Sequence, residues 1–397
     1  MLGAYRILDL TWVLGGPFAG QLLAQLGADV IKIETLDGDL SRVVPPHFFE
    51  GDSSFFLAVN RGKKSVAIDL KLPEGKAAFY DLVREADAVV YGFAPDVPKR
   101  LGIDFDSLKA INPRICVAEL IGLHDEGEYA RAPAYDLIVQ AMGGVMSITG
   151  EAGRPPSRVG YQIGDLAAGL YLALGVCSGL LKAKGSGEGG HVQISLLDCQ
   201  LALLTWQAQN YFISGEVPVA LGSRSPMISP SEAFLCSDGR YLAISPTGDH
   251  FWREFCVVIG RPDMNQDPRY AKRPARVANL QQLAAELAHI FAQRPAKEWE
   301  EKLFAARIPA SVVLNVPEAV DQPVARMRAM VESLPEAKSG KPMRFLGNPF
   351  KYAGAAPLSY PPAHGAATRE IFRDVCRYDD SQIDDLIEKR ALYAGGE

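Results

Sequence analysis

The first two hundred residues alternate between short apolar runs, typical of buried strands, and longer stretches with the spacing of amphipathic helices. Because strands that alternate with helices imply right-handed crossovers, the pattern predicts a parallel, doubly wound α/β sheet. The run at 88–93 is apolar throughout, which suits a strand covered on both faces. The predicted strands are residues 5–13, 28–34, 65–70, 88–93 and 115–121, and the predicted helices are residues 18–26, 73–85 and 104–111.

The pattern changes twice farther along the chain. From residue 135 it is helical, with a long apolar helix that opens at Gly164-Asp165, a strand at 191–195 and a helix at 196–213. A segment rich in Gly, Ser and Pro then predicts a linker, and the short strands and amphipathic helices beyond it predict a smaller α+β domain. We therefore divide the chain into a large domain at 1–215, a linker at 216–229, a small domain at 230–325 and a C-terminal segment at 326–397, which is Pro/Gly-rich and closes with a charged helix at 380–392.

Composition excludes several classes of protein. The chain has 397 residues, 48% of them hydrophobic and 22% charged, which argues against intrinsic disorder and coiled coil. A net charge of -6 argues against a nucleic-acid partner. The six cysteines and six histidines show no CxxC, HxxxH or HExxH spacing, so no metal site is predicted. The N-terminus shows no signal-peptide pattern, and the apolar run at 166–181 is shorter than the ~20 residues of a membrane span, so we expect a cytoplasmic protein without a membrane partner.

The glycine-rich turn after the first strand does not match a nucleotide-binding motif. The segment GGPFAG at 15–20 lacks the second glycine of GxGxxG, because Pro17 stands there, and Gln21 replaces the lysine of a Walker A loop. This predicts a tight strand-to-helix turn whose backbone N–H groups can meet a phosphate or a carbonyl.

Basic residues follow two of the predicted strands. Lys71 stands at the far end of the strand at 65–70, and Lys99-Arg100 follow the strand that ends at Phe93. Ligands of open α/β sheets bind outside the carboxyl ends of the strands. These positions suit an adenine nucleotide with several phosphates.

Asp165 is the acidic residue with the most informative surroundings. It stands at the head of a helix that is otherwise apolar, and two interpretations fit this position. Asp is a preferred N-cap residue, so the carboxylate can simply cap the helix. A carboxylate nucleophile needs to be ionised, fixed and poorly solvated, and the same position provides these conditions.

Six segments in order resemble the class III CoA-transferase family. They are ILDLTWVLGGPFAGQLLAQLGADVIKIE at 7–34, NRGKKSVAIDL at 60–70, YDLIVQAMGG at 135–144, SITGE at 147–151, PSRVGYQIGDLAAGLYLALG at 156–175 and GHVQISLLD at 190–198. The resemblance implies a large Rossmann-like domain, a small domain, a C-terminal segment that returns to the large domain, and an interlocked homodimer. It also implies that Asp165 is the nucleophile, that no cofactor is tightly bound, and that coenzyme A and acyl-CoA are substrates. The implied CoA contacts are Val13, Leu14, Ile68, Lys71, Gly92, Phe93, Arg100 and Leu101.

The activity that this resemblance implies is transfer of CoA from an acyl-CoA thioester to a free carboxylic acid, through an acyl-aspartyl anhydride and an aspartyl-CoA thioester. The alternatives are a 2-methylacyl-CoA racemase of the same fold and a non-catalytic CoA-binding protein. Family racemases have a histidine where this chain has Tyr135, which disfavours racemisation. Arg42, Arg158 and Arg224 are candidates to bind the second carboxylate of a dicarboxylate. The chain departs from the family pattern at Thr35, Gly92 and Ala366-Ala367.

Overall fold

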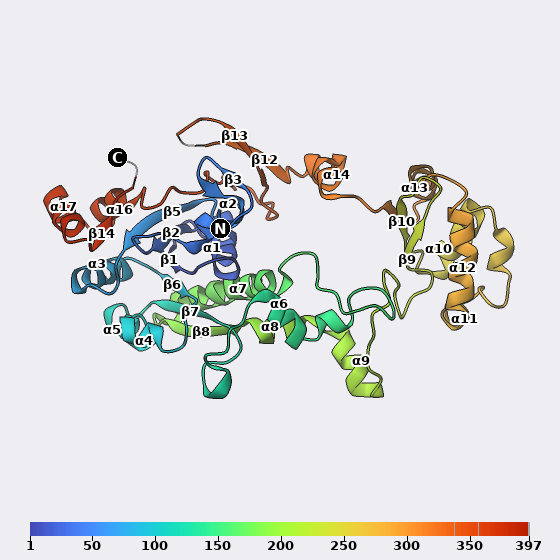
Figure 1. Cartoon of the computed structure of the whole chain (residues 1–397), viewed down its shortest axis with the longest axis horizontal. Helices are drawn as coiled ribbons and strands as arrows, with labels where there is room; N and C mark the ends of the chain where they lie inside the picture. The colour runs from blue at the N-terminus through green and yellow to red at the C-terminus, as the bar shows by residue number, and fades with distance from the viewer. Residues whose placement is uncertain (337, 356, 396–397) are drawn as a thin grey trace. The chain divides into compact units, whose positions relative to one another are not determined.

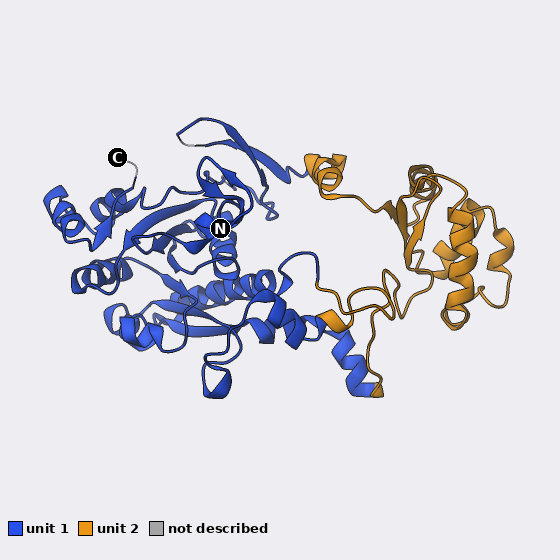
Figure 2. Ribbon diagram, in the orientation of Figure 1, with its two compact units in different colours: residues 1–145, 159–213, 327–397 blue, residues 146–158, 214–326 orange. Residues whose placement is uncertain are grey.

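The computed structural model describes residues 1–336, 338–355 and 357–395 (Figure 1). The chain divides into two compact units (Figure 2). Residues 1–145, 159–213 and 327–397 form the first unit, and residues 146–158 and 214–326 form the second. The C-terminal segment therefore belongs to the same unit as the N-terminal half of the chain.

A seven-stranded sheet lies at the centre of the first unit (Figure 1). Its strands are β14 (Leu392–Tyr393), β5 (Lys63–Ile68), β2 (Asp29–Glu34), β1 (Arg6–Leu10), β6 (Ala88–Tyr91), β7 (Cys116–Ile121) and β8 (Gly190–Ser195), in that spatial order. All neighbours pair in parallel except β14, which is antiparallel to β5. The predicted parallel α/β sheet is confirmed, and the strand order reverses between β1 and β6.

Alternate residues of the strands face two different hydrophobic layers. Leu8 and Leu10 pack in the layer that contains α3 (Pro73–Arg84). Ile7 packs in the opposite layer, with residues of α1 (Gly15–Gln25) and α7 (Ile163–Ser186). The first layer also includes α5 (Phe105–Ile111), α16 (Thr368–Asp374) and α17 (Asp380–Glu388). Both faces of the sheet are covered, which explains why its strands are apolar throughout.

Helix α7 is a core helix, although its length and composition would also suit a membrane span. It has 24 residues, with a mean hydropathy of 1.6 over its most apolar window, and 56% of that window is buried. It contacts α1, β7 and β8. Glycines allow this close approach, because a Cβ on Gly179 would lie 2.1 Å from Cys116 Sγ.

Two predicted helices end differently in the structure. The helix predicted at 196–213 is broken into α8 (Leu196–Leu203) and α9 (Trp206–Ser214) by Thr205, whose φ is +43°. The final helix, predicted at 380–392, ends at Glu388, and Arg390 then turns the chain with a φ of +58°. The backbone that follows pairs with the sheet, because Asp69 N donates to Ala391 O at 2.9 Å.

The remaining elements of the first unit are short. They are the 3-10 turns at Leu40–Val43 and Gly127–Tyr129, the hairpins of β3 (Phe48–Phe49) with β4 (Asp52–Ser53) and of β12 (Val331–Pro335) with β13 (Pro342–Leu346), and α2 (Ser54–Val59), α4 (Val97–Leu101) and α6 (Asp136–Met142). A further 3-10 turn, Val145–Ser147, spans the boundary between residues of the first and of the second unit. The β12–β13 hairpin is anchored by buried Arg61, whose guanidinium bonds Glu332 at 2.9 Å.

The second unit has a hydrophobic core of its own, built around Trp252, Phe255, Phe291 and Trp299. Its antiparallel sheet has the order β11 (Ala310–Val312), β10 (Tyr241–Ile244), β9 (Glu232–Leu235). Its helices include α10 (Asp249–Val258), α11 (Arg273–Ala278), α12 (Leu280–Phe291), α13 (Ala296–Ala305), α14 (Val316–Asp321) and α15 (Pro323–Met327). The last residue of α15, Met327, is assigned to the first unit.

The second unit is larger than the small domain of the sequence-based division, because it also contains residues 146–158 and 214–229. Residues 146–158, placed in the large domain by the sequence, belong to the second unit. A hydrogen bond joins the two segments of this unit, because Gly222 N donates to Gly150 O at 2.7 Å. The local sequence pattern of neither segment predicts a hydrogen bond between residues about seventy positions apart.

Candidate active site

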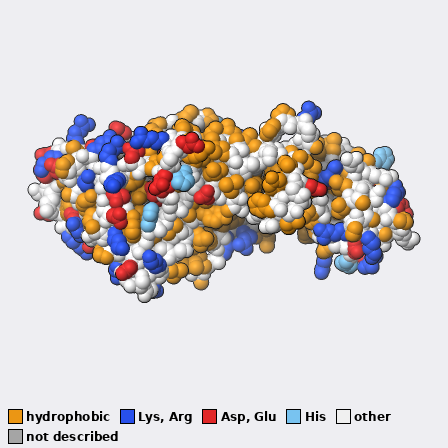
Figure 3. Space-filling model, turned by 90° about the horizontal axis from the view of Figure 1, so that it is seen from below, with side chains coloured by type: hydrophobic (Ala, Val, Ile, Leu, Met, Phe, Trp, Pro, Cys, Tyr) orange, Lys and Arg blue, Asp and Glu red, His pale blue; other side chains and the backbone are white. Residues whose placement is uncertain are grey.

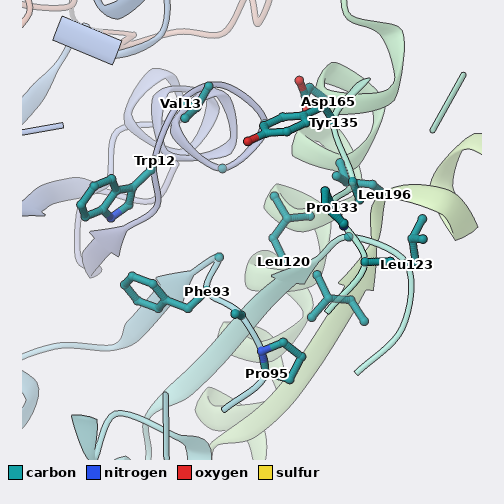
Figure 4. Close-up of a pocket in the computed structure, with 18 of the residues that line it drawn as sticks. Trp12, Val13, Phe93, Pro95, Leu120, Leu123, Pro133, Tyr135, Asp165 and Leu196 are labelled. Atoms are coloured by element: carbon teal, nitrogen blue, oxygen red, sulfur yellow. The ribbon is translucent and has the colours of Figure 1, made fainter. Parts of the chain in front are cut away.

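A pocket of about 390 Å³ lies where the strand order of the sheet reverses. The loops that follow β1 and β6 diverge there, and open α/β sheets bind ligands at such a point. Its lining comes from residues 11–16, 92–95, 120–124 and 129–135, together with Asp165 and Leu196. Figure 4 shows Asp165 beside Tyr135 at one end of the labelled residues, with Trp12 and Phe93 toward the other.

Asp165 is not the N-cap of its helix. Helix α7 begins at Ile163 and its N-cap is Gln162, so Asp165 is the third helical residue. The N-cap interpretation of Asp165 is therefore wrong. Asp136, the first residue of α6, supplies the missing acceptor instead, since Gly164 N donates to Asp136 Oδ1 at 2.9 Å.

Glycines bring Asp165 close to the turn after β1. A Cβ on Gly15 would lie 2.9 Å from the backbone O of Asp165, and a Cβ on Gly169 would lie 2.6 Å from Gly15 O. Helices α1 and α7 therefore pack backbone against backbone at this point. The carboxylate-bearing residue of α7 is fixed beside the N-terminus of α1.

The N-terminus of α1 presents backbone donors to the same pocket. Its N-cap is Leu14, without a side-chain capping bond, and Leu14, Gly15 and Gly16 all line the pocket. The first N–H groups of a helix have no acceptor within it. Val13, just before the helix, has a φ of +69°, an unusual conformation for a β-branched residue and one that recurs at functional sites.

The surroundings of Asp165 raise the pKa of its carboxyl group to about 6. Burial is the larger cause, because it disfavours the charged form, and the negative charge of Asp136 adds to it. The carboxylate is still mostly ionised at neutral pH, and its raised pKa makes it more basic than an exposed Asp. A buried, ionised and basic carboxylate next to backbone donors can attack an activated carbonyl.

This pKa predicts the acidic limb of the pH profile. Only the ionised carboxylate can attack, so kcat/KM for the acyl donor should be constant above about pH 7 and fall about tenfold per unit below the pKa of about 6. Steady-state rates from pH 4.5 to 8.5 measure this limb, with donor binding measured over the same range as the control. Asp136→Asn removes the second cause and should move the limb to lower pH. A profile that stays flat to pH 4.5 would contradict this role.

A second pocket, of about 500 Å³, adjoins the first, and Trp12 and Phe93 line both of them. Ile68, Lys71 and Leu101 line it, and so does Arg390 from the C-terminal segment. Lys71 and Arg390 are both exposed. The pairing of β14 with β5 brings Arg390 to the carboxyl end of β5.

The structure groups most, not all, of the site residues expected from the sequence. Val13, Leu14, Gly92 and Phe93 line the first pocket with Asp165, and Ile68, Lys71, Phe93 and Leu101 line the second. Arg100 lines neither pocket and is exposed on α4. Three lining residues, Trp12, Arg131 and Arg390, were not expected from the sequence. The position of Trp12 within the first predicted strand segment could have identified it, but no sequence pattern marks the two arginines as site residues.

The three arginines considered for a second carboxylate do not enter either pocket. Arg42 is buried, and its guanidinium forms salt bridges with the carboxylates of Glu34 and Asp52, at 2.8 and 2.9 Å. Arg224 pairs with Glu232 at 3.0 Å, and both Arg224 and Arg158 belong to the second unit. Among the described residues that line the first pocket, Arg131 is the only Lys or Arg. No group of three His, Cys, Asp or Glu side chains is arranged to hold a metal ion in the described part of the chain.

Comparisons with known proteins agree on one family. The profile of CoA-transferase family III matches residues 2–368. The chain is 36% identical to the acetyl-CoA:oxalate CoA-transferase of Acetobacter aceti over 92% of this chain and 94% of the relative. It is 37% identical to the succinate–glutarate CoA-transferase of Agrobacterium fabrum, over 85% of this chain and 86% of the relative. The crystal structure of a CAIB/BAIF family protein from Brucella suis superposes with a TM-score of 0.83 at 32% identity, covering 94% of this chain and 99% of that one.

Proposed function

The chain belongs to CoA-transferase family III, and we propose that it moves CoA from an acyl-CoA thioester to a free carboxylic acid with Asp165 as the nucleophile. One observation carries the proposal. Asp165 stands in the pocket at the reversal of the strand order, beside the backbone donors of α1 and with a pKa raised by burial. That is the combination that covalent catalysis at a thioester needs.

The first half of the proposed reaction loads CoA onto the enzyme. The Asp165 carboxylate attacks the thioester carbonyl, the C–S bond breaks, and a mixed anhydride forms with release of the CoA thiolate. The thiolate then attacks the Asp165 carbonyl of the anhydride. The donor acid leaves as a carboxylate, and Asp165 is left as an aspartyl-CoA thioester.

The second half mirrors the first with the acceptor acid. Its carboxylate attacks the aspartyl-CoA carbonyl, which expels the thiolate and forms a new mixed anhydride. The thiolate attacks the acyl carbonyl of this anhydride, so that the new acyl-CoA leaves and Asp165 is regenerated. No net proton or electron is exchanged, and no metal or redox group takes part in these steps.

The geometry supports two further parts of this mechanism. Each attack creates a negatively charged oxygen, and the N–H groups at the start of α1, whose residues line the same pocket as Asp165, are candidates to stabilise it. The pocket wall is mainly apolar, with Leu14, Leu120 and Leu196 among its residues, which limits hydrolysis of the anhydride.

The two adjoining pockets suit the two ends of an acyl-CoA. We propose that the nucleotide lies in the second pocket, where Lys71 and Arg390 would meet its phosphates. The chain of the thioester would then pass Trp12 and Phe93, which line both pockets, and reach Asp165 in the first. Arg100 stays a candidate for an outer contact on the exposed surface of α4.

We propose a dicarboxylic acid as the acceptor. The relatives described above, and a 34% identical succinyl-CoA:mesaconate CoA-transferase of Haloarcula hispanica, are named for dicarboxylic acids. Arg131 is the cationic side chain of the first pocket that could pair with the second carboxylate.

The direct test is an exchange screen. The purified protein is incubated with a panel of CoA esters and of mono- and dicarboxylic acids, and the products are identified by mass spectrometry. New acyl-CoA species should appear with dicarboxylates and more slowly with monocarboxylates. If acyl-CoA binds but no pair exchanges, the chain is a CoA-binding protein without transferase activity.

The racemase alternative makes a different prediction. Racemisation needs a base on each face of the α-carbon, and the position at which family racemases have a histidine holds Tyr135, which lines the first pocket and is 75% exposed. A phenol is a weaker general base than an imidazole. We expect no deuterium to enter the α-position of a 2-methylacyl-CoA in heavy water at a rate comparable with CoA transfer. Mass spectrometry of the recovered ester measures this. Rapid incorporation would favour the racemase.

We also propose that the protein is a homodimer, interlocked as the resemblance implies. Large apolar side chains are exposed on α7 (Leu170, Leu174, Leu181) and α9 (Phe212, Ile213), and one face of the molecule shows broad groups of apolar side chains (Figure 3). An interface above the common ~1,600 Å² would cover such groups. Light scattering at micromolar concentration should give twice the mass of the chain, and a monomer there would contradict the proposal.

A further inference from the structure

A buried ion pair lies behind the turn that carries the backbone donors of the site. Lys32, on β2, and Asp39, in the loop that follows, approach to 2.7 Å between Nζ and Oδ2, and both side chains are 1% exposed. Neither residue lines the pocket of Asp165; Asp39 lines the second pocket, where Asp39→Asn keeps the size of the side chain. Burial by itself would lower the pKa of Lys32, and the carboxylates of Asp39, Asp9 and Glu34 raise it, so the lysine is charged.

Both partners of the pair bond the backbone of this turn. Lys32 Nζ donates to Thr11 O at 2.9 Å, and Val13 N donates to Asp39 Oδ1 at 3.4 Å. Asp39 is itself fixed by Ser41, whose N and Oγ both donate to Oδ1 at 2.8 Å. The other end of the turn is held by Asp9, whose carboxylate accepts from Thr11 N at 3.0 Å.

The turn needs this support because of its conformation. Val13 has a φ of +69°, which a β-branched residue adopts only where its surroundings impose it. The conformation of Val13 sets the direction of the N–H groups that follow, at Leu14, Gly15 and Gly16. These groups line the pocket beside Asp165.

We propose that Lys32 and Asp39 are positioning residues for the reaction at Asp165: their ion pair holds the turn at 11–14 so that the N–H groups at the start of α1 point to the reacting carbonyl. The inference rests on the proposed function. A buried ion pair contributes little stability compared with well-packed apolar side chains of the same size, so its value here lies in the geometry that it imposes.

The test variant removes both charges together. Lys32→Met alone would leave Asp39 charged and unpaired in the interior and can fail to fold. The double variant Lys32→Met/Asp39→Asn leaves neither member of this pair charged and keeps an oxygen for Ser41 and Val13, but it removes the bond to Thr11 O. We expect kcat to fall roughly 10- to 100-fold, the scale for a displacement of about 1 Å at a reacting group, with KM for the acyl donor within threefold.

Two further measurements separate positioning from stability. The single-turnover rate at which Asp165 becomes acylated should fall as much as kcat, whereas the Kd for CoA and the melting temperature should change little. The control is Arg61→Met/Glu332→Gln, which neutralises the ion pair between buried Arg61 and partly exposed Glu332 of the β12–β13 hairpin, away from both pockets. It should keep kcat, whatever its effect on the melting temperature.

The outcomes distinguish the inference from the function on which it rests. A Lys32→Met/Asp39→Asn variant with kcat within threefold of the wild type overturns the inference and leaves the proposed function intact. The same holds if kcat falls only in proportion to the folded fraction, or equally in the Arg61/Glu332 control. If the wild type transfers no CoA at all, the proposed function is wrong and the inference fails with it.

Discussion

Asp165→Asn is expected to lower the rate of CoA transfer by roughly four orders of magnitude, the scale of loss when a covalent nucleophile is removed. The amide is nearly the same size as the carboxylate but cannot form the anhydride. Because Asp136, not Asp165, accepts the Gly164 N–H, the substitution leaves the capping of α7 in place. The loss should therefore appear in kcat, with little change in the binding of acyl-CoA.

The same variant should be at least as stable as the wild type at neutral pH. The pKa of Asp165 is raised to about 6 in the folded protein, so its stability contribution is complete below the unfolded pKa of about 4 and is lost as pH rises through 6. At pH 7 to 8 the buried, ionised carboxylate lowers the free energy of unfolding, whereas the neutral Asn does not. We therefore expect the free energy of unfolding of the variant to exceed that of the wild type by about 1 to 2 kcal/mol. The gain should vanish toward pH 4. Denaturant unfolding at the two pH values measures it.

A matched control exists in the neighbouring helix. Asp198 is the third residue of α8, as Asp165 is of α7, but it lines neither pocket. Asp198→Asn should keep the transferase rate. Hydroxylamine or borohydride added during turnover should modify Asp165 and leave Asp198 unmodified. An Asp165→Asn protein that retains most of its activity would show that another group is the nucleophile.

Gly169→Ala should damage both stability and activity through the contact between α1 and α7. The added Cβ would lie 2.6 Å from Gly15 O and 2.9 Å from a ring carbon of Phe18, so the two helices must separate. Overpacking of this kind costs about 1 to 3 kcal/mol, more than the ~1 kcal/mol that Ala gains over Gly in a helix. Separation also moves the start of α1 away from Asp165, and kcat should fall about tenfold or more.

Gly185→Ala is the control for this prediction. Gly185 lies in the same helix, but a Cβ there would meet no atom within 4 Å. The substitution should raise the stability by up to about 1 kcal/mol and leave kcat unchanged. Denaturant midpoints and steady-state rates of the two variants give the comparison. If Gly169→Ala is as stable and as active as Gly185→Ala, the close packing of α1 on α7 does not position the site.

The sequence by itself determined the parallel strands of the α/β sheet and the family, but not the antiparallel strand β14. Apolar runs such as 88–93 indicate strands covered on both faces, because a strand with apolar side chains on both sides is stable only where both sides are buried. The resemblance of the segment at 156–175 to the family identified Asp165 as the candidate nucleophile, because that motif is contiguous in the chain. The smaller α+β unit is also visible in the sequence, because it has its own local pattern and core.

Only the tertiary structure decided how distant segments complete the site. Arg390 reaches the second pocket because β14 pairs with β5, more than three hundred residues away in the chain. Arg42, a reasonable ligand for a carboxylate by its charge, is unavailable because Glu34 and Asp52 hold it. The pKa of Asp165 depends on burial and on Asp136, neither of which its own helix reveals. Periodicity and turn signals are short-range properties, whereas contacts, burial and electrostatic coupling arise only when the chain is packed.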